Sequence, residues 1–152
     1  MKGLRFKMSI FYELSDNFSV DAKEEPPSEE QIKELEKFSS IEIPLDYLEL
    51  VREATEVEIK VKDEMYIRIW GPIDSIEMNE AHYIQEYIPN SLAIGDDEGG
   101  NVLLYVNGKK GFGLYMVGFG DLDIEDAVLV APSLRDLLVN NIGIDVVMSG
   151  YV

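Results

Sequence analysis

The densest group of side chains that could bind or catalyse is the run Asp96-Asp97-Glu98-Gly99-Gly100. Three adjacent carboxylates could hold a calcium ion or dock on a basic partner. An EF-hand calcium loop places its oxygen ligands at alternating positions and adds a glycine and a distant glutamate. The run does not follow that spacing, so we expect no metal site there. The alternative to a docking role is a solvated turn whose glycines adopt positive φ angles.

A second group of carboxylates lies near residue 121. Asp121 and Asp123, followed by Glu125 and Asp126, could place two carboxylates on one side for general acid–base work. Catalytic carboxylate pairs depend on a pKa difference that burial creates, and a sequence does not display burial. A solvated loop before a strand is therefore the favoured interpretation, and docking on a basic partner is the functional alternative.

Residues suited to other chemistry are scarce. The chain has no cysteine and a single histidine, His82, which excludes a disulfide scaffold, a thiol nucleophile and a cysteine zinc site. The sequence contains no Gly-x-Ser-x-Gly, so no nucleophile elbow accompanies His82. We therefore expect no catalytic residues, no metal and no cofactor. A small enzyme that uses its carboxylates is the least favoured interpretation.

Trp70 is the only tryptophan, and it precedes Gly71-Pro72 at the end of an expected strand. Tryptophan is enriched among the residues that dominate binding at protein interfaces, so Trp70 could anchor a partner. A lone tryptophan is more often part of the core. The sequence leaves both roles open.

The net charge narrows the class of partner. The 152 residues carry a formal charge of −17, and residues 69–152 contain three basic against thirteen acidic side chains. Such a chain repels phosphate backbones and anionic lipid, so we expect no nucleic-acid and no membrane partner. The charge favours a basic protein that docks on acids of the second half, and solubility is the alternative use of the charge. The leading candidates are Asp96, Asp97, Glu98, Asp121 and Asp123.

No apolar run reaches the roughly 18 residues of a membrane helix. Residues 8–14 are too short and too polar for the apolar part of a signal peptide. The expectation is a cytoplasmic protein. Its length fits one domain over residues 1–152, as a monomer or a dimer.

Capping patterns predict the helices. Ser28 and Gln31 form a capping box for a helix over residues 29–39. Pro44 begins a second helix, and the two are expected to form an αα-hairpin. Asn79 is expected to cap a short helix that Pro89 stops. A last helix should begin at Ser133 and end at Gly143.

Alternating apolar residues predict the strands. The expected strands span residues 3–14, 56–61, 65–70, 92–95, 101–106, 112–117, 128–130 and 144–148. Residues 15–27 are interpreted as a loop, and the turn containing Asn107-Gly108 indicates a hairpin. The strand at 3–14 should pair with a sheet edge, either in the same chain or in a second copy. Strands grouped between helices indicate an α+β fold, with a curved, mainly antiparallel sheet and helices packed against it.

The order of several short motifs resembles the SUKH superfamily, which includes fungal cell-wall-assembly regulators and bacterial immunity proteins. The motifs are Ile43-Pro44-Leu45-Asp46, Trp70-Gly71-Pro72-Ile73, the run from Leu92 to Gly100, and Val130-Ala131-Pro132-Ser133-Leu134. The resemblance covers residues 28–142, so the expected N-terminal strand is an addition to it.

The resemblance implies a non-enzymatic protein-binding domain. Bacterial members neutralise toxins, often nucleases, by direct contact, which implies an immunity-type protein with a toxin domain as its partner. The composition permits this, because the active faces of nucleases are basic and would attract an acidic inhibitor. A regulatory or scaffolding adaptor of the same fold, with another client protein, is the alternative.

Overall fold

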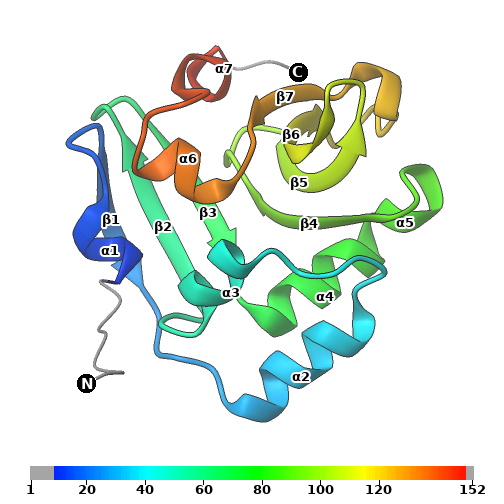
Figure 1. Cartoon of the computed structure of the whole chain (residues 1–152), viewed down its shortest axis with the longest axis horizontal. Helices are drawn as coiled ribbons and strands as arrows, with labels where there is room; N and C mark the ends of the chain where they lie inside the picture. The colour runs from blue at the N-terminus through cyan, green and yellow to red at the C-terminus, as the bar shows by residue number, and fades with distance from the viewer. Residues whose placement is uncertain (1–8, 150–152) are drawn as a thin grey trace.

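A computed structural model describes residues 9–149 and contains an open seven-stranded sheet (Figure 1). The strands lie in space in the order in which they occur in the chain, and each neighbouring pair is antiparallel. They are β1 (Phe18–Lys23), β2 (Glu56–Val61), β3 (Met65–Trp70), β4 (Ser91–Asp96), β5 (Asn101–Gly108), β6 (Gly111–Gly118) and β7 (Val128–Ala131). The predicted α+β fold is confirmed.

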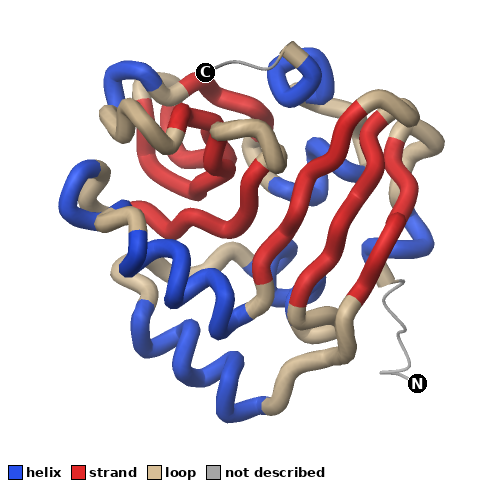
Figure 2. Tube along the Cα trace, turned by 180° about the vertical axis from the view of Figure 1, so that it is seen from behind, coloured by secondary structure: helices blue, strands red, loops and turns tan. Residues whose placement is uncertain are grey.

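The sheet has two parts that meet at a narrow seam between β3 and β4. Strands β1–β3 form a gently twisted ribbon, whereas β4–β7 coil tightly (Figure 2). The residue pairs Arg68–Asp96 and Ile69–Gly95 join the two parts. A Cβ atom on Gly95 would lie 2.4 Å from the carbonyl oxygen of Arg68. Glycine is therefore required here, because it lets the two backbones approach closely where the sheet changes direction.

Burial differs between the two parts and explains their sequence patterns. In β2 buried and half-buried residues alternate, because one face of this part is covered. All residues of β4 are buried, because a core lies on each face. Alternate residues of β5 supply the two cores: Leu103 joins the large core and Leu104 the small one.

Helices cover the large core and close one end of the sheet. Within the described residues they are α1 (Ile10–Glu13), α2 (Glu29–Phe38), α3 (Leu45–Val51), α4 (Pro72–Ala81), α5 (Ile84–Tyr87), α6 (Leu134–Leu138) and α7 (Ile144–Met148), with a 3₁₀ turn η1 at Ile124–Asp126. The capping box at Ser28 and Gln31 is confirmed, with hydrogen bonds of 3.0 and 3.2 Å. Helix α3 follows Pro44 as expected.

The expected αα-hairpin of α2 and α3 is wrong. Helix α2 runs beside α4 instead, as both views show (Figures 1 and 2). Residues 39–44 connect α2 to α3, and Ile43 among them is buried in the large core.

The N-terminal prediction is also corrected. Residues 3–8 of the expected strand at 3–14 lie outside the described residues, and Ile10–Glu13 is a helix. Its N-cap Ser9 accepts a hydrogen bond from the Phe11 amide, and the hydroxyl of Ser9 donates to Glu53. Strand β1 lies in the segment expected to be a loop. Apolar Phe18, Val20 and Ala22 do alternate with polar residues in β1, but only Phe18 is buried, and the polar surroundings concealed this short pattern.

Three local predictions in the second half are corrected. Helix α4 begins at Pro72, so Asn79 lies inside it and does not cap a helix. The last predicted helix ends at Leu138, and Gly143 precedes a further helix, α7, where a strand was expected. The hairpin of β5 and β6 is confirmed, but Gly108 pairs with Gly111, which leaves Lys109 and Lys110 as the turn.

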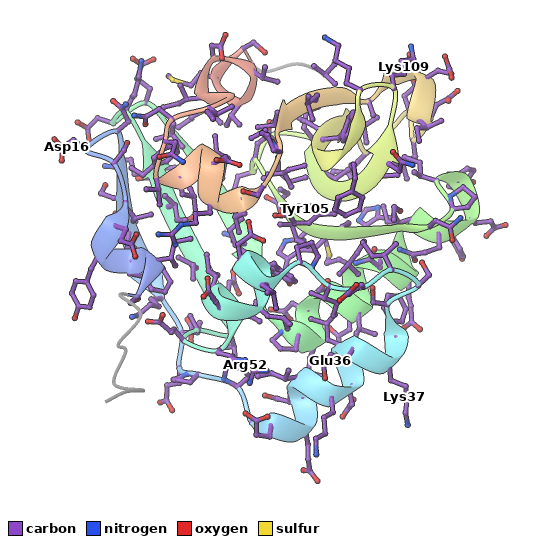
Figure 3. The ribbon with its side chains drawn as sticks, in the orientation of Figure 1. Asp16, Glu36, Lys37, Arg52, Tyr105 and Lys109 are labelled. Atoms are coloured by element: carbon purple, nitrogen blue, oxygen red, sulfur yellow. The ribbon has the colours of Figure 1, made fainter. Side chains whose placement is uncertain are left out.

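Tyr105 projects from β5 (Figure 3) and connects both α3 and α6 to the sheet through a polar network. The Tyr105 hydroxyl donates to Asp46 at 3.0 Å and accepts from the Leu134 amide at 2.7 Å. Asp46 also accepts from the Arg135 amide at 2.9 Å. Burial, followed by the charge of Asp46, raises the pKa of Tyr105. The network thus joins residues 89 positions apart in the chain.

Candidate partner-binding site

The six residues predicted to bind a partner occupy two neighbouring segments. Trp70 ends β3, Asp96 ends β4, and Asp97 and Glu98 form the turn that follows, whereas Asp121 and Asp123 lie between β6 and β7. The amide of Phe119 donates to the carbonyl oxygen of Gly100 at 2.9 Å. The fold therefore brings the acidic turn at residues 96–100 next to the start of the acidic loop at 119–126.

Trp70 and Asp96 form a buried pair. Trp70 is 3% exposed and Asp96 is 9% exposed. The indole Nε1 donates to Asp96 Oδ2 at 2.9 Å, and the hydroxyl of Tyr47 donates to the carbonyl oxygen of Trp70 at 2.6 Å. A carboxylate can stay in such a buried place because its oxygens accept hydrogen bonds. The other oxygen of Asp96 accepts from the Glu98 amide.

Asp97 organises the turn from inside. It is 8% exposed, and its Oδ1 accepts from the amides of Gly99 and Asn101, each at 2.9 Å. Its Oδ2 accepts from Asn101 Nδ2 at 2.7 Å. Asp96 and Asp97 thus direct their carboxylates into the protein, and Glu98 is the most exposed acid of this turn, although its side chain is only 26% exposed.

Arg68 is the cation of this region and is shared among three glutamates. Its guanidinium lies 2.9 Å from Glu56 and 3.4 Å from both Glu58 and Glu98. Burial, followed by a hydrogen bond with Glu58, raises the pKa of Glu98 to about 7, although Arg68 opposes the shift. One positive charge therefore does not neutralise this cluster.

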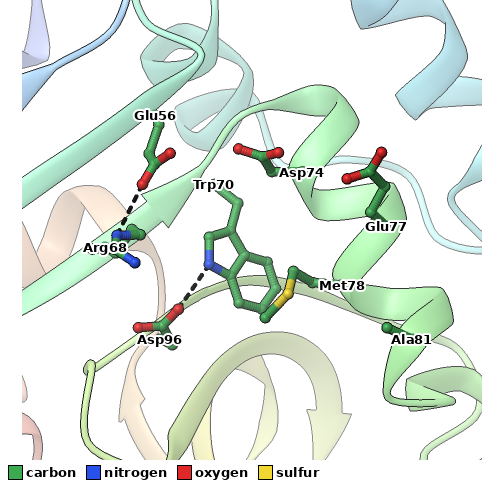
Figure 4. Close-up of a pocket in the computed structure, with 8 residues that line it drawn as sticks. All are labelled: Glu56, Arg68, Trp70, Asp74, Glu77, Met78, Ala81 and Asp96. Atoms are coloured by element: carbon green, nitrogen blue, oxygen red, sulfur yellow. Dashed lines mark hydrogen bonds and ion pairs between the residues drawn. The ribbon is translucent and has the colours of Figure 1, made fainter.

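A pocket of about 390 Å³ opens beside this cluster (Figure 4). It lies between the ends of β2, β3 and β4 and one side of α4. The lining residues are Glu56, Arg68, Trp70, Asp74, Glu77, Met78, Ala81 and Asp96. We call it the tryptophan pocket. Burial raises the pKa of Glu56, and Asp74 and Asp96 add to the shift while Arg68 opposes it.

A second pocket, of about 450 Å³, is lined in part by the residues that follow helix α4. Ala81 lines the tryptophan pocket, and His82 lines this tyrosine pocket together with Tyr83, Tyr87, Phe119, Gly120, Asp121 and Leu122. Tyr83 is 61% exposed and Tyr87 is 59% exposed. Tyr83 has a φ of +55°, which is unusual for a bulky residue. The rings of His82 and Phe119 lie 4.4 Å apart and form its inner wall.

The acidic loop borders the tyrosine pocket. Asp121 and Asp123 are both exposed, and Asp123 caps η1 by accepting from the Glu125 amide at 2.9 Å. A hydrogen bond with Asp121, and then the charge of Asp121, raises the pKa of Asp126. Lys109 opposes this shift, and it forms an ion pair with Glu125 at 3.3 Å. Both side chains of that pair are exposed, so it is worth little.

Sequence reasoning missed Asp74, Glu77, Tyr83 and Tyr87. The first two reach the pocket because α4 packs across the end of the sheet, which the sequence pattern did not reveal. The spacing of the two tyrosines in the sequence could have revealed them. They are spaced i, i+4, next to the buried Ile84 and Ile88, and so form the outward face of that turn.

The family model that matches this chain is that of the SMI1/KNR4 family (SUKH-1), over residues 26–140. The chain belongs to this family. No curated protein matches it closely enough to count as a relative. All six predicted partner residues and both pockets fall within the SUKH-1 match, whereas α1, β1 and α7 fall outside it.

Two further findings apply to residues 9–149 of this SUKH-1 chain. None of its described helices is long and apolar enough to cross a membrane. No group of three or more histidine and carboxylate side chains in this part is arranged to hold a metal ion.

Proposed function

We propose that this SUKH-1 protein is a non-enzymatic, immunity-type binding domain that acts in the cytoplasm by covering a basic toxin domain, such as a nuclease. The observation that carries the proposal is the family match over residues 26–140. Membership of this family fits an immunity-type or regulatory protein that binds other proteins. The net charge of −17 supports a basic partner, because opposite charges speed encounter.

The proposed contact face runs over both pockets and the acids between them. Exposed Tyr83 and Tyr87 supply the kind of aromatic anchors that dominate interface energies. Asp121 and Asp123 supply the charge around them, and Glu98 adds to it as pH rises above its pKa of about 7. Asp97 supports the face from beneath, because it is buried, and Trp70 and Asp96 reach the surface only where they line the tryptophan pocket.

The test is co-expression with a toxin domain encoded beside the gene. Survival of the host and a stable complex of purified components support the immunity role. A complex without protection favours the regulatory adaptor instead. If neither that toxin domain nor any basic protein tested binds the chain, the proposal is wrong.

Variants at the tyrosines test the face. The double change Tyr83→Ala and Tyr87→Ala should weaken binding by about 2 kcal/mol or more, roughly thirtyfold, if these residues are hot spots. Tyr12→Ala is the matched control, because Tyr12 is exposed on α1, on the other side of the molecule (Figure 1). Equal affinities for the two variants would contradict the proposed face.

Association rates test the role of charge. The change of both Asp121 and Asp123 to asparagine should slow association and flatten its dependence on salt, with little effect on dissociation. Association that is independent of salt in the unchanged protein would leave solubility as the use of these charges.

A further inference from the structure

The tryptophan pocket combines an apolar wall with an excess of negative charge. The wall is the indole of Trp70 with the thioether of Met78 against it (Figure 4). Asp96 holds the indole in place by the 2.9 Å hydrogen bond to Nε1. The wall is therefore fixed before any ligand arrives, apart from the flexible methionine.

The charges around the wall do not cancel. Four carboxylates line the pocket, from Glu56, Asp74, Glu77 and Asp96, against the single guanidinium of Arg68. Arg68 is already engaged by Glu56, Glu58 and Glu98. Asp74 and Glu77 are exposed, and no salt bridge within residues 9–149 involves either of them.

The arrangement of these groups matches a long basic side chain. Asp74 and Glu77 project from α4 at the rim, and Trp70 and Met78 lie between them and Asp96 (Figure 4). Lysine and arginine pack their methylene stems on apolar surface and keep the charged head among polar groups. A neutral side chain would lose the interaction with the rim, and an acidic one would be repelled.

We propose that the tryptophan pocket receives a lysine or arginine side chain of the partner protein. The proposal deepens the proposed function and depends on it for the source of that side chain. The stem lies along Met78 and the small part of Trp70 that lines the pocket, and the charged head pairs with Asp74 and Glu77. The pocket then selects partners by one basic residue at a defined place, beyond the general attraction of the acidic surface.

The sole tryptophan makes the pocket directly observable. Tryptophan fluorescence of the whole protein reports on Trp70 alone. The probes are N-acetyl-arginine amide and N-acetyl-lysine amide, which are cations without a carboxylate. N-acetyl-citrulline amide is the neutral control, because it has nearly the shape of the arginine probe. The expected result is a saturable change in fluorescence with at least one cationic probe and none with citrulline.

Matched variants connect the signal to the rim. The double change Asp74→Asn and Glu77→Gln should lower the affinity for the cationic probe about threefold to tenfold, as expected for partly exposed charge pairs. Glu80→Gln is the control, because Glu80 is an exposed acid of the same helix that does not line the pocket. Thermal melting checks that all variants fold.

Three results would overturn the inference. They are no saturable response to either cationic probe, an equal response to the citrulline probe, or a loss of affinity in Glu80→Gln equal to that in the Asp74→Asn and Glu77→Gln double variant. The failure of the proposed function is a separate outcome. If a basic partner binds and the rim variants leave its affinity unchanged, the pocket assignment is wrong while the proposed function stands. If the cationic probes bind as expected but no basic protein does, the proposed function fails and the pocket remains.

Discussion

Single side chains in this protein connect distant segments, and Tyr105 is the clearest case. Its hydroxyl satisfies both Asp46 on α3 and the Leu134 amide at the start of α6. Tyr105→Phe removes that hydroxyl and leaves the Leu134 amide without its acceptor. We expect a loss of about 1.5–3 kcal/mol in the free energy of unfolding, measured by urea denaturation.

Tyr12→Phe is the matched control, because Tyr12 is exposed. It should change the unfolding free energy by less than about 0.5 kcal/mol. If the two variants were equally stable, the Tyr105 network would contribute nothing.

Glu98 should make stability depend on pH. Its pKa is raised to about 7 in the folded protein, from the 4.5 that is usual for a glutamate. Between these values the folded state holds a proton that the unfolded state has released. The contribution to stability is therefore complete below the unfolded pKa and is lost as pH rises through about 7.

Glu98→Gln should remove this contribution. We expect the variant to lose less stability than the unchanged protein when pH rises from about 5 to about 8, as measured by urea denaturation at both values. Glu80→Gln, on the exposed face of α4, should leave the pH dependence as it was. An unchanged pH dependence in Glu98→Gln would show that Glu98 titrates normally.

At the scale of elements, the seam between β3 and β4 is the sensitive point. The backbone of Gly95 lies so close to Arg68 that a methyl group would overlap its carbonyl oxygen. Gly95→Ala should force β3 and β4 apart and lower the free energy of unfolding by about 1–3 kcal/mol or more. The readout is the midpoint of urea unfolding.

Gly120→Ala provides the comparison. A Cβ atom at Gly120 meets nothing within 4 Å, and its φ is not in the left-handed region. This change should be close to neutral. If Gly95→Ala lowered the free energy of unfolding as little as Gly120→Ala does, the backbones at the seam could move apart at little cost, against this prediction.

The sequence predicted those elements whose signals are local. Helix α2 was predictable because Ser28 and Gln31 satisfy each other within one turn. Strand β2 was predictable because one of its faces is covered. Strand β1 was missed because its alternation is only six residues long and lies within a mostly polar segment, and Phe18 alone is buried. The helix at Ile10 was missed because its cap at Ser9 gains support from Glu53, 44 residues away.

The candidate site was predictable to a lesser degree. The charge and its concentration at residues 96–98 and 121–123 are visible in the sequence. The burial of Asp96 and Asp97 is not, because it depends on the indole of Trp70 and on the turn ending at Asn101. The tryptophan pocket was missed because packing of α4 across the end of the sheet brings Asp74 and Glu77 to it.

At the scale of the whole molecule, the excess of negative charge should oppose compactness. The chain has thirty acidic residues and only thirteen basic ones. The excess acidic side chains repel one another more strongly in the folded state than in the expanded one, because they lie closer together. Adding sodium chloride to about 0.2 M should therefore raise the melting temperature, because the Debye length falls below about 8 Å. A melting temperature that falls or stays constant would show that the surface charges are already balanced locally.

The N-terminal segment gives a second prediction at this scale. Ile10 is buried in the large core, and the Ser9 hydroxyl donates to Glu53. Deleting residues 1–14 should therefore lower the melting temperature. Deleting residues 1–8 alone is the comparison, because it keeps both contacts. Equal melting of the shorter deletion, the longer deletion and the full chain would show that Ile10 adds no stability.

The chain-order arrangement of the seven strands has a consequence for how the protein folds. Most strand pairings close a short loop, so hairpins such as β5–β6 can form early at small entropic cost. The bond from Arg135 to Asp46 spans 89 residues and closes a long loop. We expect the hairpins to form before α6 docks on α3. Substitutions around Asp46 would then speed unfolding much more than they slow folding.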